Sequence, residues 1–141
     1  MTSPLDIKLI LCDAAQADPN GKVHILGAGW SVTATPTTPQ AVAILIKVPG
    51  DRADQQISGT LRLLDADGQA VEVETFPGKK EPIENEFELE VGRPPGLEHD
   101  RMIDAAMVLN IGPMPLPLGR YQWRLDMNGQ TEIVSFTVTN C

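Results

Sequence analysis

The sequence YQWRLDMNGQTEIVSFTVT, residues 121–139, decides the fold of this chain. Apolar and polar residues alternate over its first seven positions, which is the period of a half-buried strand. Asn128-Gly129 follows, and this dipeptide favours a two-residue type I′ turn because both central residues need a positive φ. The turn and the hydrophobic pattern then predict a single register for the hairpin. The expected cross-strand pairs are Trp123 with Val134 and Tyr121 with Phe136.

Side-chain direction follows from this register. Tyr121 and Trp123 should face a core, whereas Gln122, Arg124 and Glu132 should point the other way. The sequence therefore predicts a C-terminal hairpin with an aromatic inner face.

A second hairpin is expected at the start of the chain, with strands in Asp6–Ala17 and Lys22–Thr33. Asp18-Pro19-Asn20-Gly21 suits a turn, since proline fits its second position and Gly21 supplies a left-handed residue. The expected pairs are Ile10 with Trp30, Cys12 with Ala28 and Ala14 with Leu26. Gly27-Ala28-Gly29 resembles part of a dinucleotide fingerprint, but Val32 stands where a third glycine is needed. These glycines indicate a bulge or a close backbone approach.

Further strands are separated by loops rich in glycine and proline. At Asp65–Gly68 a three-residue loop is expected, because it sets Leu63 against Val71 and Leu61 against Val73. The other expected strands are Ala41–Val48, Glu86–Val91, with Phe87, Leu89 and Val91 inward, and Ile103–Ile111, which also has some helix propensity. The expected loops are Ser31–Pro39, Pro49–Gln55, Phe76–Asn85, Gly92–Asp100 and Gly112–Gly119. This pattern predicts one all-β domain over residues 1–141, an immunoglobulin-like antiparallel sandwich of roughly seven to nine strands.

Three segments are apolar on both faces: Ile7–Ala15, Val23–Trp30 and Val42–Ile46. A sandwich covers only one face of each sheet, so the second face should meet either solvent or a partner. The residues expected to form such an interface are Ile10, Cys12, Leu26, Trp30, Ile44 and Ile46. The alternative is that Ser31–Pro39 or Phe76–Asn85 covers this face internally.

Composition restricts the partners. The 141 residues carry a net charge of −8 and only 4% aromatic residues. Phosphate would be repelled and single-stranded bases would lack a stacking surface, so we expect no nucleic-acid partner. The run Leu9–Cys12 is too short for a signal or membrane segment, so no membrane partner is expected either. Without a secretory signal, Cys12 and Cys141 are expected as free thiols in a reducing compartment. The expected location is the cytoplasm, or a virion if the protein is encoded by a phage.

Candidate chemistry is sparse. His24 lies in mid-strand, and Glu98-His99-Asp100 is the one loop cluster worth testing for catalysis. Asp65–Gly68 resembles the start of a calcium loop but lacks the distal glutamate, and no spaced Cys/His set suits zinc. We therefore expect no catalytic residue, no metal ligand and no cofactor.

Short motifs stand near both ends of the chain: Leu11-Cys12-Asp13 with Ala15, Gly21-Lys22-Val23 and Ile25-Leu26-Gly27 at the opening, and Leu118-Gly119-Arg120-Tyr121 and Asn128-Gly129 at the close. In these motifs the chain resembles a bacterial family of small uncharacterised β-proteins, common in actinobacteria and their phages. The resemblance spans nearly the whole chain and departs from it at Thr35–Pro39 and Gly92–Asp100. Its motifs are turns and strand residues, so it implies a β fold and supplies no catalytic or binding residue.

Two functions are weighed on these grounds. The first is a non-enzymatic structural or interaction module that docks to a protein partner or to itself, for example in a phage virion. The second is a small-ligand or carbohydrate-binding module that uses end loops, with Trp30 or Tyr121 as a platform. The inward assignment of Tyr121 and Trp123 disfavours the second.

Overall fold

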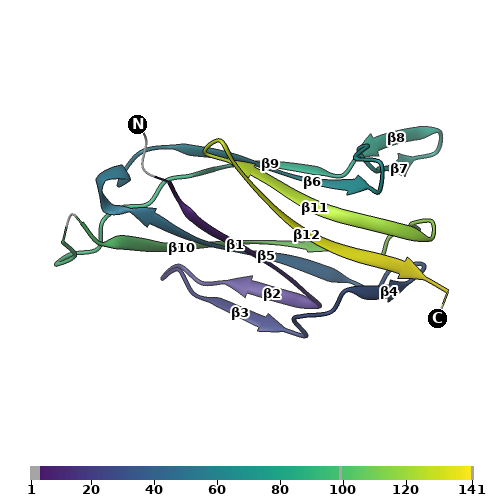
Figure 1. Cartoon of the computed structure of the whole chain (residues 1–141), viewed down its shortest axis with the longest axis horizontal. Coiled ribbons are helices and arrows are strands. Elements are labelled where there is room, and N and C mark those ends of the chain that lie inside the picture. Colours follow the sequence, from purple (N-terminus) through teal and green to yellow (C-terminus); the bar gives the residue numbers. More distant parts are fainter. Residues whose placement is uncertain (1–3, 99, 141) are drawn as a thin grey trace.

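The computed structural model describes residues 4–98 and 100–140, which form an all-β domain (Figure 1). Two sheets face each other across one hydrophobic core. The three-stranded sheet contains, in order, β1 (Asp6–Cys12), β5 (Gln40–Pro49) and β10 (Met102–Ile111). The five-stranded sheet contains, in order, β4 (Val32–Ala34), β12 (Gln130–Thr139), β11 (Gly119–Met127), β6 (Ile57–Asp65) and β9 (Glu84–Leu89). The expected sandwich is confirmed.

The strand orders are those of an immunoglobulin-like domain. The order β1-β5-β10 corresponds to A-B-E, and β12-β11-β6-β9 corresponds to G-F-C-C′. Tyr121, near the start of β11, donates a hydrogen bond from its hydroxyl to the Pro117 carbonyl at 2.7 Å, as in a tyrosine corner. One pair departs from the antiparallel expectation, because β4 runs parallel to β12. The segment Ser31–Pro39, expected as an edge or loop, thus contributes a short edge strand.

The C-terminal hairpin has the expected register. Trp123 lies opposite Val134, Tyr121 lies opposite Phe136, and the turn residues Asn128 and Gly129 have φ of 58° and 70°. Trp123 is fully buried, and the Tyr121 and Phe136 rings stack 5.7 Å apart.

One side-chain direction in this hairpin was predicted wrongly. Glu132 lies opposite Leu125, so it shares the inner face and does not point outward. Ile133, opposite Arg124, takes the outward position and is 48% exposed. A rule that places apolar side chains inward and charged side chains outward therefore fails at Glu132 and Ile133, close to the turn.

The prediction of the N-terminal hairpin is fully correct only near its turn. β2 (Ala14–Ala17) and β3 (Val23–Leu26) pair with Ala14 opposite Leu26, as expected. Beyond this pair the prediction holds only in part. β1 forms its ladder with β5, where Ile10 lies opposite Ala43 and Cys12 opposite Ala41, and residues 27–31 form no strand. Two hydrogen bonds nevertheless keep the expected register, because the Asp13 amide bonds to the Gly27 carbonyl and the Gly29 amide bonds to the Leu11 carbonyl, both at 3.2 Å. Positive φ at Gly27 (66°) and Gly29 (95°) interrupts the extended conformation of the returning chain.

The middle of the chain also differs in part from the predicted structure. The Asp65–Gly68 loop is confirmed: Gly68 has φ 78° and the Val71 amide bonds to the Leu63 carbonyl at 3.0 Å. Leu61, however, pairs with Asn85 of β9, not with Val73. The expected loop 76–85 largely forms strand, since residues 72–82 make the hairpin of β7 (Glu72–Phe76) and β8 (Lys79–Pro82). Gly78, at φ 82°, supplies its turn.

Several of the remaining segments are as expected, but the described residues form twelve strands where roughly seven to nine were expected. The segment 103–111 is a strand, β10, and residues 112–118 form the expected link to β11. Phe87, Leu89 and Val91 pack against the core, and Gly59 leaves room for the Phe87 ring opposite it. The loop after β5 contains a short 3-10 helix, η1 (Gly50–Arg52).

Candidate functional site

Three of the expected interface residues are buried. Ile44 and Ile46 lie on the inner face of β5 and belong to the hydrophobic core. Cys12 is fully buried, and its thiol donates to the Ala41 carbonyl at 3.5 Å. Burial, together with the charge of Asp13, raises the pKa of this thiol, which makes it unreactive. These residues do not form a surface in this structure.

Trp30 and Ile10 are half-buried. Trp30 packs edge-on against Phe136, with ring centroids 6.0 Å apart, and so contacts the core. Ile10 lies in one cross-strand row with Ala43 and Val108, on the face of the three-stranded sheet that points away from the core.

That outer face is covered by the β2–β3 hairpin. Figure 1 shows β2 and β3 as a third layer below β5 and β10, and Ala43 is fully buried although it faces away from the core. The Asn110 side chain fastens the hairpin to β10: its Nδ2 donates to the Ala15 carbonyl at 3.1 Å, and its Oδ1 accepts from the Ala15 amide at 3.4 Å. The tip approaches so closely that a Cβ at Gly21 would lie 2.7 Å from the Asp104 carbonyl oxygen. The chain thus covers its own second apolar face.

The covering element carries an uncovered apolar surface of its own, which we call the hairpin face. Leu26 is 71% exposed there, the highest value among the exposed large apolar side chains of the described residues. A shallow groove of about 630 Å³ runs along it. Its lining residues are Ala14, Ala15, Gln16, Val23, His24, Ile25 and Leu26. The hairpin face is therefore concave and more apolar than polar, and it contains no Asp, Glu, Lys or Arg.

The turn at the end of this hairpin is held by Asp18. Its Oδ1 accepts hydrogen bonds from the amides of Asn20 (2.8 Å) and Lys22 (3.3 Å). The Asn20 bond is the main reason that the pKa of Asp18 lies below its ordinary value. His24 Nε2 lies 3.7 Å from Asp18 Oδ2. These contacts hold the turn that leads into β3.

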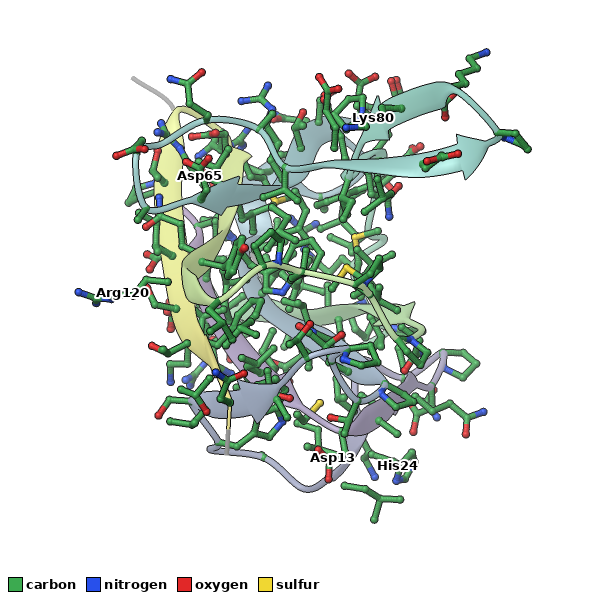
Figure 2. All side chains as sticks on the ribbon, turned by 90° about the vertical axis from the view of Figure 1, so that its right-hand side faces the viewer. Asp13, His24, Asp65, Lys80 and Arg120 are labelled. Atoms are coloured by element: carbon green, nitrogen blue, oxygen red, sulfur yellow. The ribbon has the colours of Figure 1, made fainter. Side chains whose placement is uncertain are left out.

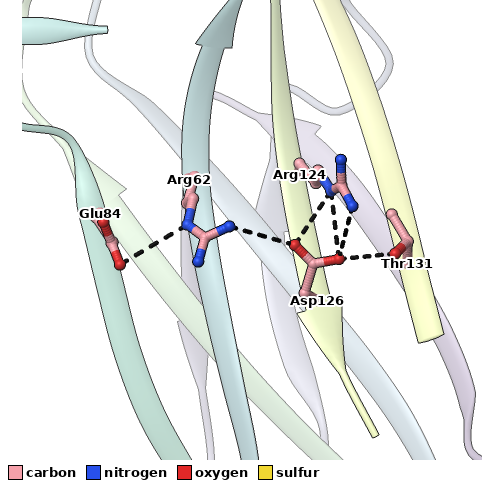
Figure 3. Close-up of polar contacts among 5 residues, drawn as sticks. All are labelled: Arg62, Glu84, Arg124, Asp126 and Thr131. Carbon is pink, nitrogen blue, oxygen red and sulfur yellow. Dashed lines mark hydrogen bonds and ion pairs between the residues drawn. The ribbon is translucent and has the colours of Figure 1, made fainter. Parts of the chain in front are cut away.

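The opposite surface of the molecule, the outer face of the five-stranded sheet, is polar. Figure 3 shows Asp126 at the centre of a charge network on this face. Arg124 donates to both oxygens of Asp126 at 3.1–3.2 Å, Thr131 donates at 2.7 Å, and Arg62 lies 3.6 Å from Asp126 and 3.7 Å from Glu84. Partial burial raises the pKa of the Asp126 carboxyl, but these donors and charges outweigh it and leave the pKa below its ordinary value. The network satisfies its own charges and offers no reactive group.

The structure gives little support for catalysis by the loop cluster Glu98-His99-Asp100. His99 lies outside the described residues. Glu98 pairs with Arg101 at 3.9 Å, and Asp104 pairs with Lys47 at 2.8 Å, so two carboxylates near it already have cationic partners. In residues 4–98 and 100–140, no group of histidine, cysteine or acidic side chains could hold a metal ion. The same part of the chain contains no helix long and apolar enough to cross a membrane.

The fold and this surface define a small immunoglobulin-like β-sandwich with an added hairpin layer. Residues 8–139 match a family of unknown function, DUF6941, and the chain belongs to that family. The comparison with curated proteins gave no match. The expected membership of an uncharacterised family is thereby confirmed.

Sequence reasoning found Leu26 but assigned it to the wrong surface. The signal was the pair Gly27 and Gly29, which the sequence indicated as a bulge or a close backbone approach: both have a positive φ, and a Cβ at Gly27 would collide with the Asp13 carboxylate. Asn110 gives a further signal, because it is a polar side chain on the outer face of an otherwise apolar strand end. Its side-chain amide donates and accepts hydrogen bonds as the backbone of a paired strand does, and only the tertiary structure shows that Ala15 is its partner.

Proposed function

We propose that this protein is a non-enzymatic interaction module that docks to a protein partner through the hairpin face. The observation that carries this proposal is the 71% exposure of Leu26 beside the apolar groove of β2 and β3. Exposed apolar surface that forms a concave patch is typical of interaction sites, whereas single exposed apolar residues are ordinary.

The distribution of charge supports the same surface. The chain carries −8 overall, yet residues 23–30 contain no Asp, Glu, Lys or Arg. Interface centres are depleted in charged residues, because each buried charge must be desolvated. The hairpin face meets this condition, and the charge network around Asp126 does not.

The ligand-binding alternative has less support. A carbohydrate site needs an exposed aromatic side chain, and Tyr121, Trp123 and Phe136 are buried in the core. Trp30 is held edge-on against Phe136. The family resemblance suggests a phage virion as the assembly. A docking module would suit such an assembly, so we include it in the proposal.

Site-specific photo-crosslinking tests the proposal. A photoreactive amino acid is placed at Leu26 or, as the matched control, at Ile133, which is an apolar residue 48% exposed on the opposite surface. Irradiation of cells that produce the protein should give a discrete protein adduct from position 26 and none from position 133. No adduct from position 26, or equal adducts from both positions, would refute docking through the hairpin face.

A further inference from the structure

The free edge of β3 is the feature from which the further inference starts. Among the described strands, β3 is hydrogen-bonded to β2 alone, so its other edge is open. Figure 1 places β3 as the outermost strand on that side of the molecule. An open edge presents unpaired backbone amides and carbonyls, which another extended segment can pair with.

The open strand edges of β9 and β3 differ in their charged residues. β9, at the edge of the five-stranded sheet, has exposed Glu84, Glu86 and Glu88, and charged side chains are a common protection against edge pairing. β3 has none of these features: Val23–Leu26 contains no Asp, Glu, Lys or Arg, no proline and no register shift. The β3 edge therefore lacks the protection against pairing that the β9 edge has.

The charges at the two ends of β3 point to the occupant. Exposed Lys22 immediately precedes the strand, and Asp13 lies at its far end. There the Asp13 amide bonds to the Gly27 carbonyl at 3.2 Å, and the Asp13 carboxylate lies where any side chain at Gly27 would collide with it. Figure 2 shows Asp13 and His24 together at the end of the molecule opposite Lys80. The edge therefore has a cation at one end and an anion at the other.

We propose that β3 pairs antiparallel with β3 of a second copy of this chain, forming a four-stranded β2-β3-β3-β2 sheet across a twofold axis. Antiparallel pairing brings Lys22 of each copy to the Gly27 end of the other copy, where Asp13 lies, so two complementary charge contacts form at once. The proposal rests on the proposed function, because it names the partner of the same hairpin.

A second copy suits this edge better than it suits any charged edge. Each chain carries −8, so two copies repel one another unless the contact itself is neutral or complementary. At β9 two copies would bring glutamates together. At β3 they would join a strand without Asp, Glu, Lys or Arg between two opposite-charge contacts.

The test measures self-association of the full chain by sedimentation velocity, with circular dichroism as the check on folding. The wild type should be dimeric at high micromolar concentration. Lys22→Glu and Asp13→Lys should each weaken the dimer about tenfold or more, because each replaces two attractive contacts with two repulsive ones. Lys80→Glu, on the exposed β8 far from the hairpin, makes the same charge change and should leave dimerisation unaffected.

Mixing the two single variants makes the test independent of any local damage. In their heterodimer the glutamate introduced in one copy meets the lysine introduced in the other, and the unchanged Lys22 and Asp13 meet at the second contact. Both contacts are then attractive, so an equimolar mixture should recover wild-type association. The inference is overturned if the wild type is monomeric, if Lys22→Glu behaves like Lys80→Glu, or if the mixture stays monomeric. A monomeric chain that still gives a position-26 adduct with another protein would overturn this inference and leave the proposed function standing.

Discussion

At the scale of single residues, Trp123 is the largest fully buried side chain of the described part of the chain. It is fully buried, and its Nε1 donates to Gln40 Oε1 at 3.0 Å inside the core. Trp123→Ala should lower the free energy of unfolding by about 3–5 kcal/mol, because it leaves a large cavity. Gln122→Ala, on the outer face of the same strand, should cost less than about 0.5 kcal/mol. Urea unfolding measures both, and similar losses would contradict the assigned inner face.

Asp126 should make stability depend on pH. Its pKa is lower in the folded state than in the unfolded chain, so its stabilisation is complete above the unfolded value of about 3.9 and is lost as the pH falls through the folded value. Asp126→Asn should therefore be less stable than wild type at neutral pH by roughly 0.2–1 kcal/mol, the usual worth of an exposed ion pair. Urea unfolding at neutral and strongly acid pH should show this difference disappearing in acid. A difference that persists in acid would refute the electrostatic origin.

At the scale of elements, the turn of the C-terminal hairpin depends on Gly129. Its φ of 70° suits glycine, and a β-branched residue there should cost about 1–3 kcal/mol. Gly112→Val is the matched control, because Gly112 is exposed, lacks a positive φ and has open space around its Cα. Thermal unfolding of Gly129→Val and Gly112→Val should separate the two. Equal melting temperatures would show that the turn tolerates side chains at both positions.

Removal of the β2–β3 hairpin should expose the outer face of the three-stranded sheet without unfolding the sandwich. Asp13 and Gly27 are hydrogen-bonded neighbours, so two glycines can replace residues 14–26 without moving the ends of the cut. The shortened chain should keep its β signal in circular dichroism but bind an apolar fluorescent dye strongly, because the outer face of β5 becomes exposed. The intact chain is the reference, and a folded, shortened chain with no added dye binding would show that the hairpin covers nothing.

At the scale of the whole molecule, the acidic edge should govern solubility. Replacing Glu84, Glu86 and Glu88 together with Thr should cause aggregation through β9, because it removes the charges that guard this edge. The control replaces Glu72, Glu74 and Glu81 with Thr, which changes the net charge equally on the β7–β8 hairpin. Light scattering over time distinguishes them. Similar scattering from both would show that net charge, not the edge, keeps the protein soluble.

The parts of this molecule that the sequence predicts are those governed by neighbouring residues. Turn chemistry at Asn128-Gly129 and at Asp65–Gly68 determined local registers that the structure confirms. Errors arise where a strand has a partner that is distant in sequence: β1 forms its ladder with β5, and Leu61 pairs with β9. Partner choice depends on the energies of long-range packing, which local periodicity does not contain. For the same reason the pattern could show that β5 is apolar on both faces, but not that β2 and β3 cover one of them.

The parallel pairing of β4 with β12 has a mechanical consequence. β1 begins near one end of the long axis and β12 ends near the other (Figure 1), so tension applied through the chain pulls β4 backward while it pulls β12 forward. In parallel strands such a load acts along the strands, so the contacts of Val32–Ala34 with Thr137–Thr139, and the bond from the Thr137 amide to the Ser31 carbonyl, share the load together. Hydrogen bonds sheared together resist more force than bonds that open one after another. This short edge strand should therefore resist shear near the C-terminal end of β12.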